Sequence, residues 1–212
     1  MAKWTAFPFD SADYSCDAAA LKKRWARLHT GDAEPLPKDD KVLAAWTLFH
    51  AGDFQKAFDA GLKAASAGSP GGITVANKAQ CIYANYLEKS EKNKLAMFLE
   101  AAERAEGQQA SEPKNANAYY WQAYALGRYS QGISVAKALT QGLGVRIRHA
   151  LETAIERCPQ HADAHLALAS FHAEVIDKVG SMVGGMTYGA DKAAGLALYQ
   201  KAMALNPDSV VT

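Results

Sequence analysis

The sequence predicts an all-α protein built from antiparallel helical hairpins, and three observations lead to this prediction. Apolar residues recur at helical spacing, as in Leu21, Trp25 and Leu28, which would share one face of a helix. Two helical stretches end in proline, LETAIERCP at Pro159 and LYQKAMALNP at Pro207, where a helix cannot readily continue. No stretch bounded by hairpin turns alternates between apolar and polar residues, so no β-sheet is expected.

Composition and charge narrow the functional classes. The chain has 212 residues, enough for one domain or one compact array of repeats. Its 23 basic and 22 acidic residues give a formal charge of +1, so neither a nucleic-acid partner nor an anionic membrane surface is expected. No apolar run reaches the roughly 18 residues of a membrane-spanning helix, and the first residues lack the apolar stretch of a secretory signal. We therefore expect a cytoplasmic protein without membrane insertion.

The three cysteines, Cys16, Cys81 and Cys158, stand far apart in the sequence. They form no CxxC motif and no close cysteine–histidine pair. This pattern predicts reduced thiols rather than a disulfide framework or a structural zinc site. We expect no bound metal and no cofactor.

Residues 1–37 are expected to form an N-terminal cap. Their first part holds aromatic residues around a proline in too irregular a pattern for a helix, so we expect it to lie extended across the first hairpin. These aromatic residues are Trp4, Phe7, Phe9 and Tyr14. Asp17 can then N-cap a helix through AAALKKRWARLH. The prolines and acids of TGDAEPLPKDD predict a loop after that helix.

Residues 38–212 are expected to form a helical repeat domain. Turns divide it into four hairpins, at about residues 38–69, 73–107, 115–159 and 161–207. The last two hairpins are unusually long, since 46 positions separate Pro113 from Pro159 and 48 separate Pro159 from Pro207. The extra residues, 130–144 and 176–189, fall between the first and second helix of each pair. We expect these matching insertions to be extended connections on the binding face.

Small and large residues recur at set positions of the hairpins, because helices pack closest where no bulky side chain intervenes. They are Gly52, Phe54, Ala57 and Ala64 in the first hairpin, Ala123, Ala154 and Pro159 in the third, and Ala169, Gly195, Tyr199, Ala202 and Pro207 in the fourth. This pattern resembles the tetratricopeptide (TPR) repeat, a helical hairpin of roughly 34 residues.

By this resemblance the chain is identified as a member of the TPR superfamily. Its long insertions and the ending YGADKAAGLALYQKAMALNPDS are similar to the TPR proteins associated with TRAP-type bacterial transporters and to uncharacterised bacterial TPR proteins. Roughly residues 116–207 also resemble the helical domain of the regulator-of-microtubule-dynamics proteins. The TPR resemblance implies a right-handed superhelix of about nine helices with a concave binding groove.

The TPR resemblance also assigns groove positions on the first helix of each hairpin. These positions are Val42, Trp46 and His50, then Tyr120, Tyr124 and Arg128, then Leu166, Ser170 and Glu174. Because most of them are aromatic or apolar, the groove is expected to suit an apolar peptide, an amphipathic helix or a small apolar ligand rather than a free carboxylate. The alternative is that Tyr120 and Tyr124 pack against the N-terminal aromatic segment.

The second insertion carries Met182, Met186 and Tyr188 among four glycines. We interpret these residues as an adaptable apolar lip over the groove, with a flexible connection between helices as the alternative. The nearby His161, His165 and His172 are spaced so that they lie on neighbouring faces of one helix. We expect them to pack inside the protein, and metal binding is the alternative.

Together these observations predict a non-enzymatic scaffold that binds a protein or peptide partner through its groove. No nucleophile–base order, paired carboxylate or metal motif supports an enzyme. The alternative is a small-ligand-binding protein whose pocket is walled by the long helices and the glycine- and methionine-rich insertion. Leu196 and Met203 belong to a last helix with no capping helix after it, so self-association through its exposed face is also expected.

Overall fold

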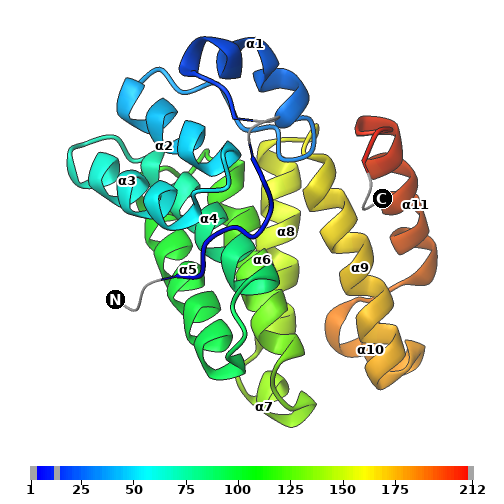
Figure 1. Cartoon of the computed structure of the whole chain (residues 1–212). Helices are drawn as coiled ribbons and strands as arrows, with labels where there is room; N and C mark the ends of the chain where they lie inside the picture. Colours follow the sequence, from blue (N-terminus) through cyan, green and yellow to red (C-terminus); the bar gives the residue numbers. More distant parts are fainter. Residues whose placement is uncertain (1–3, 12–14, 210–212) are drawn as a thin grey trace.

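Eleven helices make up the regular secondary structure of residues 4–11 and 15–209, which are the residues that the computed structural model describes (Figure 1). In chain order they are α1 (Ala18–Leu28), α2 (Asp40–His50), α3 (Phe54–Ser66), α4 (Gly72–Tyr86), α5 (Glu91–Ser111), α6 (Ala116–Gln131), α7 (Val135–Thr140), α8 (Leu143–Arg157), α9 (Ala162–Val179), α10 (Ser181–Tyr188) and α11 (Lys192–Leu205). The all-α prediction is confirmed.

The expected number of about nine helices was wrong for the described chain, and the two insertions account for the difference. Each was expected to be an extended connection, but α7 forms in the first and α10 in the second. The Ser134 side chain caps α7 by accepting a hydrogen bond from the Lys137 amide. Gly189 closes α10 in the left-handed region, at φ 60°, where glycine is unstrained.

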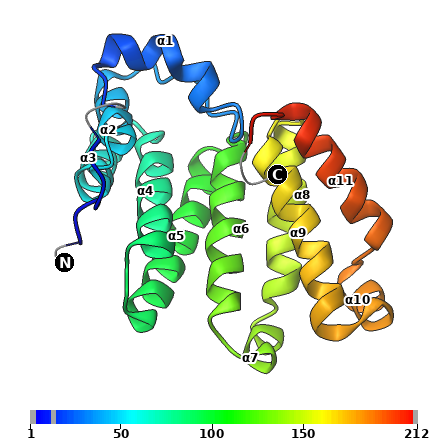
Figure 2. The ribbon, with the colours of Figure 1, turned by 45° about the vertical axis from the view of Figure 1, so that its right-hand side comes forward.

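The longer helices stand side by side in a row that runs from α4 through α5, α6, α8 and α9 to α11 (Figure 2). Antiparallel neighbours pack along this row, with α5 against α6, α6 against α8 and α9 against α11. In the view of Figure 2 the helix α1 lies above the row, and α7 and α10 lie below it. Small residues permit the closest contacts: a Cβ on Gly61 of α3 would lie 2.5 Å from the Gly72 carbonyl oxygen of α4.

Two clusters of buried apolar side chains form the core, and α4 contributes to both. The first joins the four helices α1, α2, α3 and α4 around Trp25 and Trp46. The second joins α4, α5, α6, α8 and α9 around Phe98, Leu126 and Leu151. The helices of the two clusters therefore turn apolar faces to the interior, as their sequence spacing predicts.

The N-terminal aromatic segment lies against α3 and α4. Trp4 stacks on Tyr83 with ring centroids 4.4 Å apart and packs obliquely on Phe58. The Thr5 amide donates a 3.0 Å hydrogen bond to the Tyr83 hydroxyl. Phe7 meets the edge of Phe54. The segment thus covers a seam between helices; Tyr14, expected in the same cap, falls outside the described residues.

The connection between α1 and α2, residues 29–39, passes the starts of α6 and α9 and contacts these helices, which come much later in the chain. The Gly31 carbonyl accepts a 2.9 Å hydrogen bond from the Asp163 amide at the start of α9. The Asp32 carbonyl accepts one of 3.0 Å from the Asn117 side chain of α6. The Trp25 indole donates to the Glu34 carbonyl at 2.7 Å, which fixes the connection to α1.

Among the described helices, none combines the length and the apolar character that crossing a membrane requires.

Candidate functional site

A cavity of about 500 Å³ opens on the face formed by α4, α6, α8 and α9, and we call it the groove. Its floor is apolar and comes mainly from α8 and α9. The floor residues are Leu143, Ile147, Leu151, Phe171 and Val175. These positions follow helical spacing within α8 (i, i+4, i+8) and within α9 (i, i+4), so one amphipathic stripe of each helix faces the opening.

Aromatic side chains of α6 form one wall of the groove. Tyr120 and Tyr124 lie one helical turn apart, with ring centroids 6.2 Å apart, and Trp121 packs against both. Burial raises the pKa of Tyr124 to about 12 and raises that of Tyr120 well above its usual value, so both hydroxyls stay protonated at neutral pH. This wall presents flat, neutral rings with a polar tip, a surface suited to apolar contact.

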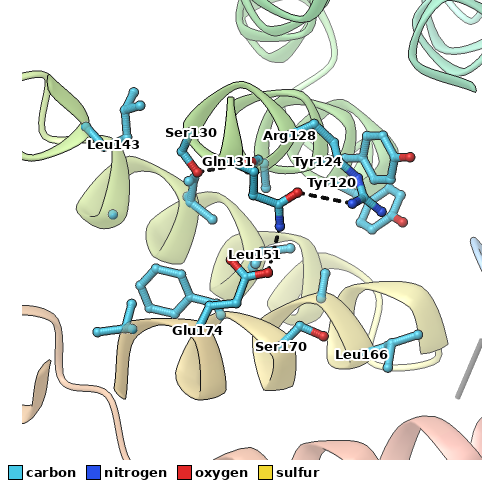
Figure 3. Close-up of a pocket in the computed structure, with 18 of the residues that line it drawn as sticks. Tyr120, Tyr124, Arg128, Ser130, Gln131, Leu143, Leu151, Leu166, Ser170 and Glu174 are labelled. Atoms are coloured by element: carbon cyan, nitrogen blue, oxygen red, sulfur yellow. Dashed lines mark hydrogen bonds between the residues drawn. The ribbon is translucent and has the colours of Figure 1, made fainter. Parts of the chain in front are cut away.

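Polar side chains bridge α6 and α9 over the apolar floor (Figure 3). The Arg128 guanidinium lies over the Tyr124 ring and donates a 3.1 Å hydrogen bond to Oε1 of Gln131. Gln131 in turn donates from Nε2 to Oε1 of Glu174 at 2.6 Å. Farther along α9, the Ser170 and Tyr199 hydroxyls are hydrogen-bonded at 3.1 Å. The bridge fixes the spacing of the two walls at this end.

Charged side chains lie at the other end of the groove, near residues 29–39. Lys78 of α4 donates a 2.5 Å hydrogen bond to Oδ2 of the buried Asp32, and its ammonium group also lies over the rings of Trp46 and Phe49. The half-buried Asp163 of α9 lines the same end. Burial, followed by the negative charge of Asp32, raises the pKa of Asp163 to about 6. We call this region the inner end of the groove.

The structure brings seven of the expected site residues to this one cavity. They are Tyr120, Tyr124, Arg128, Leu166, Ser170, Glu174 and Tyr188. Met182 and Met186 do not line it, because α10 turns both side chains outward, leaving them 74% and 84% exposed. Tyr120 and Tyr124 lie apart from the N-terminal segment, which packs on Tyr83 and Phe58 instead.

Trp46 and His50 lie outside the groove, because α1 and the connection after it cover the inner face of α2. Trp46 is fully buried against Trp25 and His29. The Nε2 atom of His50 lies 3.1 Å from Nε2 of His29. Burial, followed by the charges of His29 and Lys78, lowers the pKa of His50 to about 3, so its ring is neutral at pH 7.

The three histidines of the α9 region have hydrogen-bond partners within the protein. His161 caps α9, since its Nδ1 accepts from the Ala164 amide and its Nε2 lies 3.1 Å from Oδ1 of Asn117. His165 contacts the Pro159 carbonyl, and Nδ1 of His172 accepts from the amide of residue 191. In the described part of the chain, no group of three or more histidine, cysteine or acidic residues is arranged to hold a metal ion.

Several residues of the groove were not singled out from the sequence. The sequence pattern placed Gln131 in the first insertion, whereas it is the last residue of α6 and joins Arg128 to Glu174. Lys78 and Asp32 are separated by 46 positions, and neither belongs to a recognisable motif. Only Asp163 had a local signal, as an acid in the first turn of a helix.

The outer face of α11, expected to mediate self-association, exposes Leu196 and Met203 at 55% and 56%. The same helix packs its opposite face on α9, where Gly195 lies close to His172. Self-association through the outer face stays a prediction.

The fold and the groove define an all-α protein of packed helical pairs with an apolar, aromatic-walled cavity on one face. The family model described as RMD1-3, regulator of microtubule dynamics protein 1-3, matches residues 45–181, which is more than half of the chain. The chain therefore belongs to this family. A comparison with curated proteins gave no match.

This finding corrects the expectation of a TPR-superfamily protein of the transporter-associated kind, because the matching family is a different one. The small residues that suggested TPR repeats are explained by packing alone. Any pair of closely crossing helices needs small side chains at the crossing, as Gly61 and Gly72 show here. The matched range includes both principal walls of the groove, α6 and α9.

Proposed function

We propose that the protein is a non-enzymatic scaffold whose groove binds an apolar or amphipathic helical segment of a protein partner. The observation that carries the proposal is the groove itself, in which an apolar floor lies beside the rings of Tyr120 and Tyr124. Grooves of this kind accept the apolar face of a helix, while polar groups at the rim fix its position. We further take the helical row to be a right-handed superhelix whose inner face carries the groove.

Two further observations support this proposal. The family is described as regulating microtubule dynamics, and a protein partner is consistent with that description. The three cysteines are free thiols, which suits the reducing cytoplasm. We therefore place the function in the cytoplasm.

A small apolar ligand is the second candidate occupant. Its support is the cavity volume of about 500 Å³, which falls within the roughly 300–1,000 Å³ of small-molecule pockets. Side chains of α7 and α10, including Val135 and Tyr188, complete the walls at one end. Mass spectrometry of the purified protein under native and then denaturing conditions separates the candidates. A stoichiometric small molecule that appears only after denaturation favours this second one.

The proposal is tested with variants of two tyrosines on the same helix. Tyr124 lines the groove, whereas Tyr119 lies outside it, with its hydroxyl on the Pro113 carbonyl. Partners captured from native lysate are purified, and their affinities are measured by calorimetry. Tyr124→Ala should weaken binding by about 30-fold, a typical effect for an aromatic residue at an interface centre. Tyr119→Ala should leave it within about threefold.

Arg128→Ala provides a second test, because Arg128 covers the Tyr124 ring and holds Gln131. It should weaken binding through the loss of that ordered wall. Unchanged affinity in both Tyr124→Ala and Arg128→Ala would remove the groove as the binding surface.

A further inference from the structure

Asp163 occupies a junction between two hollows. It lines the inner end of the groove and also a second hollow of about 380 Å³, together with Gly31, Lys78 and Asn206. Its carboxylate lies directly over the backbone of residue 31, since a Cβ added to Gly31 would come within 2.5 Å of Oδ1. The absence of a side chain at Gly31 therefore leaves room for the carboxylate where the groove begins.

The carboxylate of Asp163 has no hydrogen-bond or ion-pair partner among the described residues. An acid in the first turn of a helix often interacts with free backbone amides, but here those amides are occupied. The Asp163 amide donates to the Gly31 carbonyl, and the Ala164 and His165 amides donate to His161. Helix capping therefore does not explain this acid.

The charges around Asp163 do not neutralise it. Lys78 lines the same end but is paired with Asp32, and Arg27, which lines the second hollow, is paired with Asp208. Burial lowers the pKa values of His29 and His161, the latter to about 4, so both rings are neutral at pH 7. One uncompensated negative charge thus faces the groove at neutral pH, beside the Tyr120 ring.

We propose that the partner segment carries a lysine or arginine whose charged group binds the Asp163 carboxylate at the inner end of the groove. This inference rests on the proposed function, because it names the chemistry of the segment that the groove accepts. The long alkyl part of such a side chain packs along the apolar wall by Tyr120 and Leu166, while its charged end reaches the carboxylate. The resulting charge-assisted hydrogen bond is stronger than a neutral one.

The opposite end of the groove fixes the direction of the segment. Arg128 and Lys178 line that end together with Glu174, whose carboxylate already accepts a hydrogen bond from Gln131, so the positive charges outnumber the negative one. A basic residue placed there would meet this net positive charge, which disfavours the reversed orientation. The segment therefore lies with its basic residue toward the start of α6 and α9.

The test uses synthetic amphipathic helical peptides of leucine, alanine and glutamine, labelled for fluorescence anisotropy. One peptide has a lysine near one end of its apolar face, and its matched partner has a glutamate at the same position. Wild-type protein should bind the lysine peptide about 10- to 100-fold more tightly. Asp163→Asn, which keeps the side-chain shape, should abolish this preference. Asp177→Asn removes an exposed acid on α9 outside the groove and should retain it.

The outcomes separate this inference from the proposed function. If both peptides bind equally, or if the preference for lysine survives in Asp163→Asn, the inference is overturned while groove binding stands. If neither peptide binds, the proposed function fails and the inference fails with it. Melting temperatures of both variants, followed by circular dichroism, confirm that lost preference does not reflect unfolding.

Discussion

The side-chain amide of Asn117 donates a 2.6 Å hydrogen bond to Oε2 of Glu34, which lies 83 positions earlier in the chain. The same nitrogen donates to the Asp32 carbonyl at 3.0 Å, and Oδ1 of Asn117 lies 3.1 Å from Nε2 of His161. One buried side chain therefore joins the connection after α1 to α6 and to the start of α9. These three segments form the inner end of the groove, so its shape depends on this contact.

Replacing Asn117 with alanine should destabilise the protein strongly. The change removes the Asn117 partner of the buried Glu34 carboxyl, of the Asp32 carbonyl and of Nε2 of His161, and each unsatisfied group costs about 1–3 kcal/mol. We expect a loss of about 2–4 kcal/mol in the free energy of unfolding, measured by urea denaturation. The control is Asn93→Ala, an exposed asparagine on α5, which should change stability by less than about 0.5 kcal/mol.

Glu34 should make stability fall as the pH rises. Burial, with the nearby charge of Asp32, raises the pKa of Glu34 from 4.5 to about 8. The folded state therefore binds this proton more tightly than the unfolded state, so its stabilising contribution, present below about pH 4.5, is lost as pH approaches 8. Glu34→Gln removes the titration. Its unfolding free energy should decline less between pH 6 and pH 8.5 (about two and a half units spanning that pKa) than that of wild type.

The measurement for Glu34 is urea denaturation across this pH range, with Glu103→Gln as the matched control. Glu103 is an exposed glutamate on α5, so its replacement should leave the pH slope of wild type unchanged. An identical slope in Glu34→Gln and wild type would show that Glu34 is already ionised in the folded protein.

Periodicity within single helices predicted much of the groove. Tyr120, Tyr124 and Arg128 follow one another at four-residue spacing on α6, as do Ser170 and Glu174 on α9, so each set shares a face whatever the family. The structure places both sets at the same cavity. Helical spacing carries this information because side chains four residues apart always lie on one side of a helix.

The contribution of the irregular connection could not be predicted in the same way. Trp46 and His50 obey the same spacing, but their face of α2 is covered by α1 and residues 29–39. The path of those residues depends on contacts such as Lys78 with Asp32, which no local pattern encodes. The prediction that the two insertions are extended connections was wrong for another reason. Their glycines favoured an extended chain, but packing against α8 and α9 stabilises the short helices α7 and α10.

Two glycines should respond in opposite ways to replacement by alanine, Gly61 at the crossing of α3 and α4 and Gly107 within α5. A Cβ on Gly61 would lie 2.5 Å from the Gly72 carbonyl oxygen, so Gly61→Ala forces the helices apart and should cost about 1–3 kcal/mol. Gly107 lies within α5 and has open space around its Cα. Gly107→Ala should stabilise by about 0.5–1 kcal/mol, because alanine is the better helix former. Thermal and urea denaturation measure both, and a neutral Gly61→Ala would contradict the close crossing.

Binding of a lysine-bearing segment should weaken as the pH falls through about 6, the raised pKa of Asp163. Two neighbours of Asp163 do not titrate between pH 5 and pH 7, because the pKa of Asp32 is lowered and that of His161 is lowered to about 4. A bound cation stabilises the ionised form, so affinity should be constant above the pKa and fall by up to about tenfold per pH unit below it. Anisotropy titrations of the lysine peptide at pH 5, 6, 7 and 7.5 (about half a unit to one unit apart) measure this change. Asp163→Asn should bind it weakly at every pH, whereas Asp177→Asn should reproduce the wild-type profile, and a flat wild-type profile would exclude Asp163 as the binding group.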